Sequence, residues 1–181
     1  MRAPGPLMKS VILKSFLPIF LLLQACLLFA CNPAWPAQPE SNFGFVLEFG
    51  SCSIDKLDTF KGEFTQERVV EPSITIPLQL SDEQKAMIYG KMLEINLARY
   101  PEVFEVPKPL IGDVVMLSSP YNYALMVQNG ESRISIRWTD NMVQPTTAKA
   151  DRLRELFRLI IQMVQEDSGY QQLPEVNFGC I

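Results

Sequence analysis

The sequence predicts an α+β domain, in which an antiparallel sheet of about four strands has two amphipathic helices packed on one face. Apolar and polar residues alternate from Ile74 to Leu80, as in a strand with one buried face. Asn129-Gly130 is the preferred two-residue turn of a β-hairpin. Residues 82–98 and the segment around Phe157 instead repeat apolar residues at helical spacing. Because each element has only one apolar side, both helices should cover the same face of the sheet.

The chain of 181 residues has room for one domain and a targeting region. Residues 1–30 are predicted to be a signal peptide, because a basic, acid-free start precedes an apolar run of roughly fifteen residues. Met8 is an alternative start to Met1. We expect residues 31–53 to be a lipidated N-terminus and proline-rich tether, residues 54–174 the α+β domain, and residues 175–181 a tail.

Leu28-Phe29-Ala30-Cys31 resembles the lipobox of bacterial lipoproteins, although Phe29 is bulkier than the usual residue at its position. The resemblance implies lipidation at Cys31, with Cys26 as the alternative. The acyl chains would then hold the protein on the extracytoplasmic face of the cell membrane. An ordinary cleaved signal with incidental cysteines is the competing interpretation.

Removal of residues 1–30 takes away three basic residues, which leaves 13 basic against 20 acidic and a net charge of −7. This acidic balance argues against nucleic acid as a partner, since binding a polyanion needs basic patches. The two remaining cysteines are Cys52 and Cys180. In an oxidising compartment they are candidates for a disulfide, and two free thiols are the alternative.

Several strands can be assigned along the chain. Phe43–Phe49 is apolar enough for a strand, and Phe60–Phe64 alternates apolar with charged residues. Residues 67–73 should form a loop before the strand at Ile74–Leu80. Pro77 cannot donate a hydrogen bond to a neighbouring strand, so this last strand is expected at an edge of the sheet.

The first helix is predicted from Asp82 to about Ala98. Ser81 and Gln84 have the spacing of a capping box, and Tyr100-Pro101 should end the helix. Its expected apolar stripe is Met87, Ile88, Met92, Ile95 and Leu93.

The final helix should be capped by Thr146 or Thr147 and ended by Gly169. Its expected buried stripe is Leu153, Leu156, Phe157, Ile160 and Val164. The solvent side is expected to carry Arg152, Arg154, Glu155, Arg158 and Gln162. A further turn is expected over Tyr170–Pro174.

Residues 101–120 are rich in proline and are expected to form a long, partly ordered excursion before the hairpin. A turn at Asn129-Gly130 pairs Gln128 with Glu131 and Tyr121 with Trp138. This register puts Tyr121, Tyr123, Leu125, Ile134, Ile136 and Trp138 on one face. The other face receives Asn122, Arg133 and Arg137, which form either a solvated surface or a contact surface for anions and carboxylates.

The chain contains no histidine, which excludes Ser-His and Cys-His nucleophiles and histidine-containing zinc sites. Two cysteines are too few for an all-thiolate metal site, and the glycines match no phosphate-loop spacing. Carboxylate pairs could still support acid/base or glycosidic chemistry. Glu67 and Glu71, however, lie in a loop, and nothing in the sequence brings them together. We therefore expect neither a metal nor a cofactor, and no enzymatic activity.

The chain also resembles, from Leu57 to Pro174, a family of small uncharacterised lipoproteins of Gram-positive, spore-forming bacteria. The matching segments are residues 57–62, 72–77, 80–81, 89–95, 100–101, 150–156 and 173–174. The order of elements is also similar to that of emfourin-type protein inhibitors of metalloproteases, but no shared motif transfers inhibitory residues.

The leading hypothesis is thus a lipid-anchored, non-enzymatic binding module for an unknown ligand or protein of the cell envelope or exterior. One alternative is a surface-tethered protease inhibitor that uses the segment from Glu102 to Ser119. The other is a hydrolase in which two carboxylates converge in a pocket.

Overall fold

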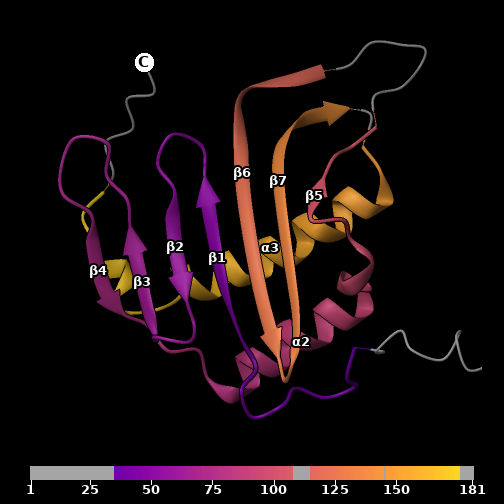
Figure 1. Cartoon of the computed structure of the whole chain (residues 1–181). Coiled ribbons are helices and arrows are strands. Elements are labelled where there is room, and N and C mark those ends of the chain that lie inside the picture. The colour runs from indigo at the N-terminus through magenta and orange to yellow at the C-terminus, as the bar shows by residue number, and fades with distance from the viewer. Residues whose placement is uncertain (1–34, 108–114, 145, 176–181) are drawn as a thin grey trace, which may run out of the picture. The chain divides into compact units, whose positions relative to one another are not determined.

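The computed structural model describes residues 35–107, 115–144 and 146–175 (Figure 1). It confirms the α+β class. The elements in chain order are β1 (Gly44–Gly50), β2 (Asp55–Asp58), β3 (Glu63–Gln66), β4 (Ile74–Pro77), α2 (Asp82–Glu94), β5 (Val103–Phe104), β6 (Val115–Asn129), β7 (Ser132–Gln144) and α3 (Ala148–Gln165). Short 3-10 helices lie at Leu97–Arg99 and Tyr170–Gln172.

The described sheet has seven strands in the order β4-β3-β2-β1-β6-β7-β5. Our expectation of about four antiparallel strands was therefore wrong. All neighbours are antiparallel except β5, which pairs in parallel with β7 at Arg137 and Trp138. The sheet is mixed because the chain crosses from the β4 edge through α2 before it reaches β5.

The N-terminal boundary that we placed at residue 54 was too late. β1 lies inside the sheet between β2 and β6, and its side chains Phe45, Leu47 and Phe49 are buried. Trp35 and Phe43 also pack against the core. Of the predicted tether, only residues 31–34 lie outside the described part of the chain. The folded unit begins at Trp35.

The predicted strand at Phe60–Phe64 is instead a turn followed by β3. Gly62 has φ +67, a left-handed conformation that glycine adopts without steric cost. The side chain of Asp58 accepts hydrogen bonds from the backbone N–H groups of Phe60 and Lys61. This turn joins β2 to β3, so the alternation of apolar and charged residues here did not indicate one continuous strand.

The edge position of β4 was predicted correctly, since β4 pairs only with β3 and carries Pro77. The predicted α2 capping box is also present, with the Ser81 side chain accepting from the Gln84 backbone and the Gln84 side chain accepting from Ser81 N–H. The helix ends earlier than expected, at Glu94, because Asn96 turns into the left-handed region. Met87 is exposed, and Tyr89 occupies the buried stripe in its place.

The β6–β7 hairpin has the predicted faces but not the predicted register. Asn129 pairs with Ser132, and Tyr123, not Tyr121, pairs with Trp138. The two turn residues are Gly130, with φ +61, and Glu131. Glycine at the first turn position suits a type II′ turn, which moves the turn one residue along. Because partners shift by two residues, every side chain stays on its predicted face.

Both helices cover the same face of the sheet, as predicted. Phe157 of α3 stacks on Tyr123 of β6 with 4.3 Å between ring centroids, and Asn129 of β6 donates to the Tyr89 hydroxyl of α2. Tyr123 and Asn129 point to one side of their strand because side chains alternate. In Figure 1, α3 lies behind the strands. The predicted stripe of α3, listed above, is fully buried.

The N-cap of α3 is Thr147, one of the two predicted residues, and its side chain accepts from the Ala150 backbone. Gly169 does not end the helix. The C-cap is Glu166, and Gly169 has ordinary right-handed backbone angles. The turn that was predicted over Tyr170–Pro174 is a 3-10 helix at Tyr170–Gln172.

Candidate functional site

The face of the sheet opposite the helices carries a shallow hollow of about 400 Å³. Leu47, Tyr123 and Trp138 face the helices, so their sequence neighbours face outward. The hollow is lined by Glu48, Ile54, Asn122, Tyr123, Ala124, Arg137, Trp138 and Thr139. Asn122 and Arg137, two of the three residues predicted as a binding surface, lie together here.

A row of charged side chains crosses four strands at this hollow. Lys56 pairs with Glu48, Glu48 with Ala124, and Ala124 with Arg137. Since neighbouring strands lie about 4.8 Å apart, the backbones at Glu48 and Arg137 are separated by roughly 10 Å. The small side chain of Ala124 therefore leaves open space between a carboxylate and a guanidinium.

Glu48 and Arg137, which lie on either side of Ala124, already have ion-pair partners. Arg137 Nη2 lies 3.1 Å from Glu102 Oε1, with side chains 65% and 67% exposed. Lys56 Nζ lies 3.9 Å from Glu48 Oε1, and these side chains are 41% and 44% exposed. Exposed pairs of this kind contribute at most about 1 kcal/mol to stability. A ligand could therefore replace either partner at small energetic cost.

The structure does not bring Arg133 into the hollow. Arg133 lies on the same face but pairs with Gln128, four residues before Arg137 on β7. At about 3.3 Å per residue this separation is roughly 13 Å. Asn122, by contrast, pairs with Thr139 and accepts a hydrogen bond from its hydroxyl at 2.9 Å. Of the three residues, only Asn122 and Arg137 line the hollow together, and their role in binding stays a prediction.

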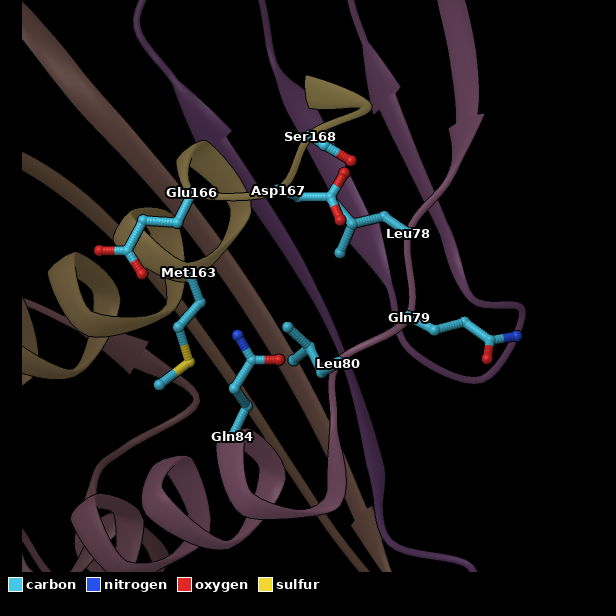
Figure 2. A pocket seen from close by; sticks show the side chains of 8 residues that line it. All are labelled: Leu78, Gln79, Leu80, Gln84, Met163, Glu166, Asp167 and Ser168. Carbon is cyan, nitrogen blue, oxygen red and sulfur yellow. The ribbon is translucent and has the colours of Figure 1, made fainter. Parts of the chain in front are cut away.

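A second hollow of about 340 Å³ lies on the helix side, at the end of α3 (Figure 2). Two acids that line it, Glu166 and Asp167, are adjacent in sequence, but Figure 2 shows their carboxylates pointing in opposite directions. Glu166 accepts from Gln162, and Asp167 accepts from the backbone N–H groups of Gly169 and Tyr170. These contacts fix helix-end structure and leave no converging carboxylate pair here.

Asp55 is a further acid in an altered environment. Burial raises the pKa of its carboxyl group, and a hydrogen bond from the Glu67 backbone opposes this increase. The negative charge of Glu67 also raises the pKa of Asp55, but Glu67 is exposed in the loop that follows β3. The loop acids Glu67 and Glu71 are also not joined, because Glu71 pairs with Arg68.

Arg154 was wrongly predicted to point into solvent. Its guanidinium forms two hydrogen bonds to the Asp140 carboxylate, at 2.6 and 2.7 Å, and lies 5.1 Å from the centre of the Trp138 ring. The side chains of Arg154 and Asp140 are only 16% and 11% exposed. The hydrogen bonds to Asp140 raise the pKa of Arg154. Asp140 on the core face of β7 was the sequence signal for a buried partner.

The aromatic side chains on the helix-facing side of the hairpin fill the core. Trp138 is 3% exposed and contacts the rings of Phe104, Tyr123 and Phe157. Burial also raises the pKa of Tyr123. These rings therefore close the sheet against α3.

Of the cysteines for which a disulfide or lipidation was predicted, only Cys52 lies among the described residues. Cys52 is disulfide-bonded, but Cys180, Cys26 and Cys31 lie outside the described residues. The pairing of Cys52 with Cys180 and lipidation at Cys31 therefore stay predictions.

No group of three or more metal-ligating side chains occurs within residues 35–107, 115–144 and 146–175. Over the same ranges, no helix is long and apolar enough to cross a membrane. No protein-family model matches the chain, and no curated protein sequence matches it.

Proposed function

We propose that the chain is a lipid-anchored, extracytoplasmic binding module that takes its ligand in the hollow on the open face of the sheet. The observation that carries the proposal is the row in which Ala124 lies between Glu48 and Arg137. The lipobox-like segment ending at Cys31 supports the anchor. The absence of histidine from the sequence removes Ser-His and Cys-His nucleophiles, which favours a role in binding.

The ligand that fits this row is a short extended peptide with free ends. Arg137 can bind a carboxylate through two parallel hydrogen bonds, and Glu48 can accept from an ammonium group. Three extended residues span roughly 10 Å, which matches the separation of Glu48 and Arg137 across two strand spacings. A volume of about 400 Å³ is also within the range of small-ligand sites.

Replacing Arg137 with glutamine should weaken binding of trialanine by about 10- to 100-fold, since a hydrogen bond to a charged group contributes roughly 1.5–3 kcal/mol. Isothermal titration of the mature protein measures this change. Arg133→Gln is the matched control, because it removes the same charge from the same strand face outside the hollow. Its affinity should equal that of the unmodified protein.

Trialanine with an acetylated N-terminus and an amidated C-terminus should also bind more weakly, because both charged ends are lost. Equal weakening by Arg133→Gln and Arg137→Gln would contradict a local contact, and would indicate only the general loss of positive charge.

Replacing Cys31 with serine should release the protein into the medium or leave its precursor unprocessed, because the thiol that carries the lipid is gone. Cell fractionation and immunoblotting measure the distribution. Cys26→Ser is the matched control and should remain in the membrane fraction. The opposite result, with only Cys26→Ser released, would move the anchor to Cys26.

Among the described residues, no contact favours either of the two alternative functions. The inhibitor hypothesis relied on the segment from Glu102 to Ser119, of which residues 108–114 lie outside the described part. Val103 and Phe104 within it belong to the sheet as β5. The hydrolase hypothesis required two converging acids, and Glu166 and Asp167 diverge (Figure 2).

A further inference from the structure

The segment from Trp35 to Asn42, here called the N-terminal strap, is fixed to the turn end of the β6–β7 hairpin. Figure 1 shows it in indigo passing that end of the molecule's sheet. Trp35 stacks on Tyr89 of α2 with 6.2 Å between ring centroids, and the Tyr89 hydroxyl donates to the carbonyl of Pro36. Tyr89 is only 2% exposed, so the strap covers a side chain that belongs to the core side of α2.

Polar contacts fix the rest of the strap to the turn. The Asn129 side chain, 1% exposed, accepts from the backbone N–H of Glu40 at 2.8 Å and donates to the Tyr89 hydroxyl at 2.9 Å. The Asn42 side chain accepts from Gly130 N–H at 2.7 Å and donates to the Gly130 carbonyl at 3.2 Å. These residues are far apart in the sequence, and together they make the strap part of the folded domain.

This fixation limits the distance between the domain and the proposed anchor. Between Cys31 and Trp35 the chain advances four residues, which span at most roughly 14 Å. If the strap were free up to β1 at Gly44, thirteen residues could span roughly 45 Å. Docking of the strap therefore shortens the free chain between Cys31 and the folded domain. It also determines which end of the domain this free chain reaches.

We propose that the turn end of the β6–β7 hairpin faces the phospholipid headgroups, and that the ligand hollow is held further from the membrane. This inference depends on the lipid anchor proposed above. Arg137 follows Glu131 by six residues on β7, so the hollow lies roughly 20 Å along the strand from the turn. The net charge of −7 beyond residue 30 opposes contact between the side of the domain and anionic lipid.

The two tryptophans of the chain allow a direct test, because Trp35 lies in the strap and Trp138 lies beside Arg137 on β7. Trp138→Phe leaves Trp35 as the only donor, and Trp35→Phe leaves Trp138. The lipidated proteins are reconstituted in phosphatidylglycerol–phosphatidylethanolamine vesicles that carry dansyl-labelled headgroups. Energy transfer from Trp35 should be several-fold more efficient than transfer from Trp138. Circular dichroism checks that both variants are folded.

The matched control is an insertion of twelve Gly/Ser residues between Ala34 and Trp35. The insertion leaves every strap contact intact but lengthens the chain between Cys31 and the folded domain. Transfer from Trp35 should then fall several-fold. Equal transfer from the two tryptophans, or an insertion without effect on Trp35, would overturn the inference. Vesicle flotation separates this failure from that of the lipid anchor: protein that does not float contradicts the anchor, and the orientation with it. Protein that floats with equal transfer contradicts the orientation alone.

Discussion

Replacing Phe157 with alanine is expected to lower the free energy of unfolding by about 3–5 kcal/mol. Phe157 is fully buried in α3 and contacts the rings of Tyr123 and Trp138. The change removes the transfer free energy of the ring and leaves a cavity between helix and sheet. An ordinary domain is stable by roughly 5–15 kcal/mol, so this single loss is a large fraction of the total. Urea denaturation of the mature protein, followed by circular dichroism, measures it.

The matched control is Arg158→Ala, one residue along the same helix and exposed to solvent. It should change the free energy of unfolding by less than about 1 kcal/mol. Equal denaturation midpoints for the two variants would mean that the helix presents a different face to the sheet.

Replacing Arg154 with methionine is expected to cost a similar amount, about 3–5 kcal/mol, because it leaves the Asp140 carboxylate buried without its cation. Methionine keeps an apolar stem against Trp138, so the change isolates the charge from most of the packing. The loss should be visible as a lower urea midpoint at neutral pH.

Two controls separate burial from charge. Arg137→Gln breaks the exposed pair with Glu102 and should cost less than about 1 kcal/mol. The double replacement Arg154→Met with Asp140→Leu should recover much of the lost stability, since two apolar side chains can replace a buried ion pair. A double variant no more stable than Arg154→Met would argue that the cost comes from altered packing.

Local sequence patterns predicted the helices and the strand faces. The Ser81–Gln84 capping box, the Thr147 cap and the buried stripe of α3 depend on residues within a few positions of each other. Strand alternation similarly assigned Arg137 to the open face and Trp138 to the core. Register was harder, because the alternation is the same after a shift of two residues. The register of β6 with β7 depends on whether the turn is at Asn129-Gly130, as predicted, or at Gly130-Glu131, as in the structure.

Features that depend on distant pairing were not predictable from these patterns. β1 occupies the middle of the sheet although its residues form only a short apolar run, and β5 is two residues long. The ion pair of Arg154 with Asp140 joins α3 to β7 and was missed because Arg154 lies on the polar side of the helical pattern. Only tertiary contacts make that position partly buried.

The candidate site was predicted only in part, because some of its residues come together through pairing between distant strands. Asn122 and Arg137 belong to one hairpin, so alternation placed both on the open face. Glu48 joins them only through the pairing of β1 with β6, and its role in the charged row depends on that register. Arg133 had the same sequence signal as Arg137, but its place along β7 keeps it out of the hollow.

The most direct test of the proposed binding module is amide chemical-shift mapping of the ¹⁵N-labelled mature protein during titration with trialanine. We expect saturable shifts at Glu48, Ala124 and Arg137, with little change at Glu166 and Asp167 beside the helix-side hollow. The Arg137→Gln variant should lose the saturable shifts while its remaining spectrum stays that of the folded protein. Shifts confined to the surroundings of Glu166 and Asp167, or none at the highest peptide concentration, would contradict the assignment of the open face as the binding site.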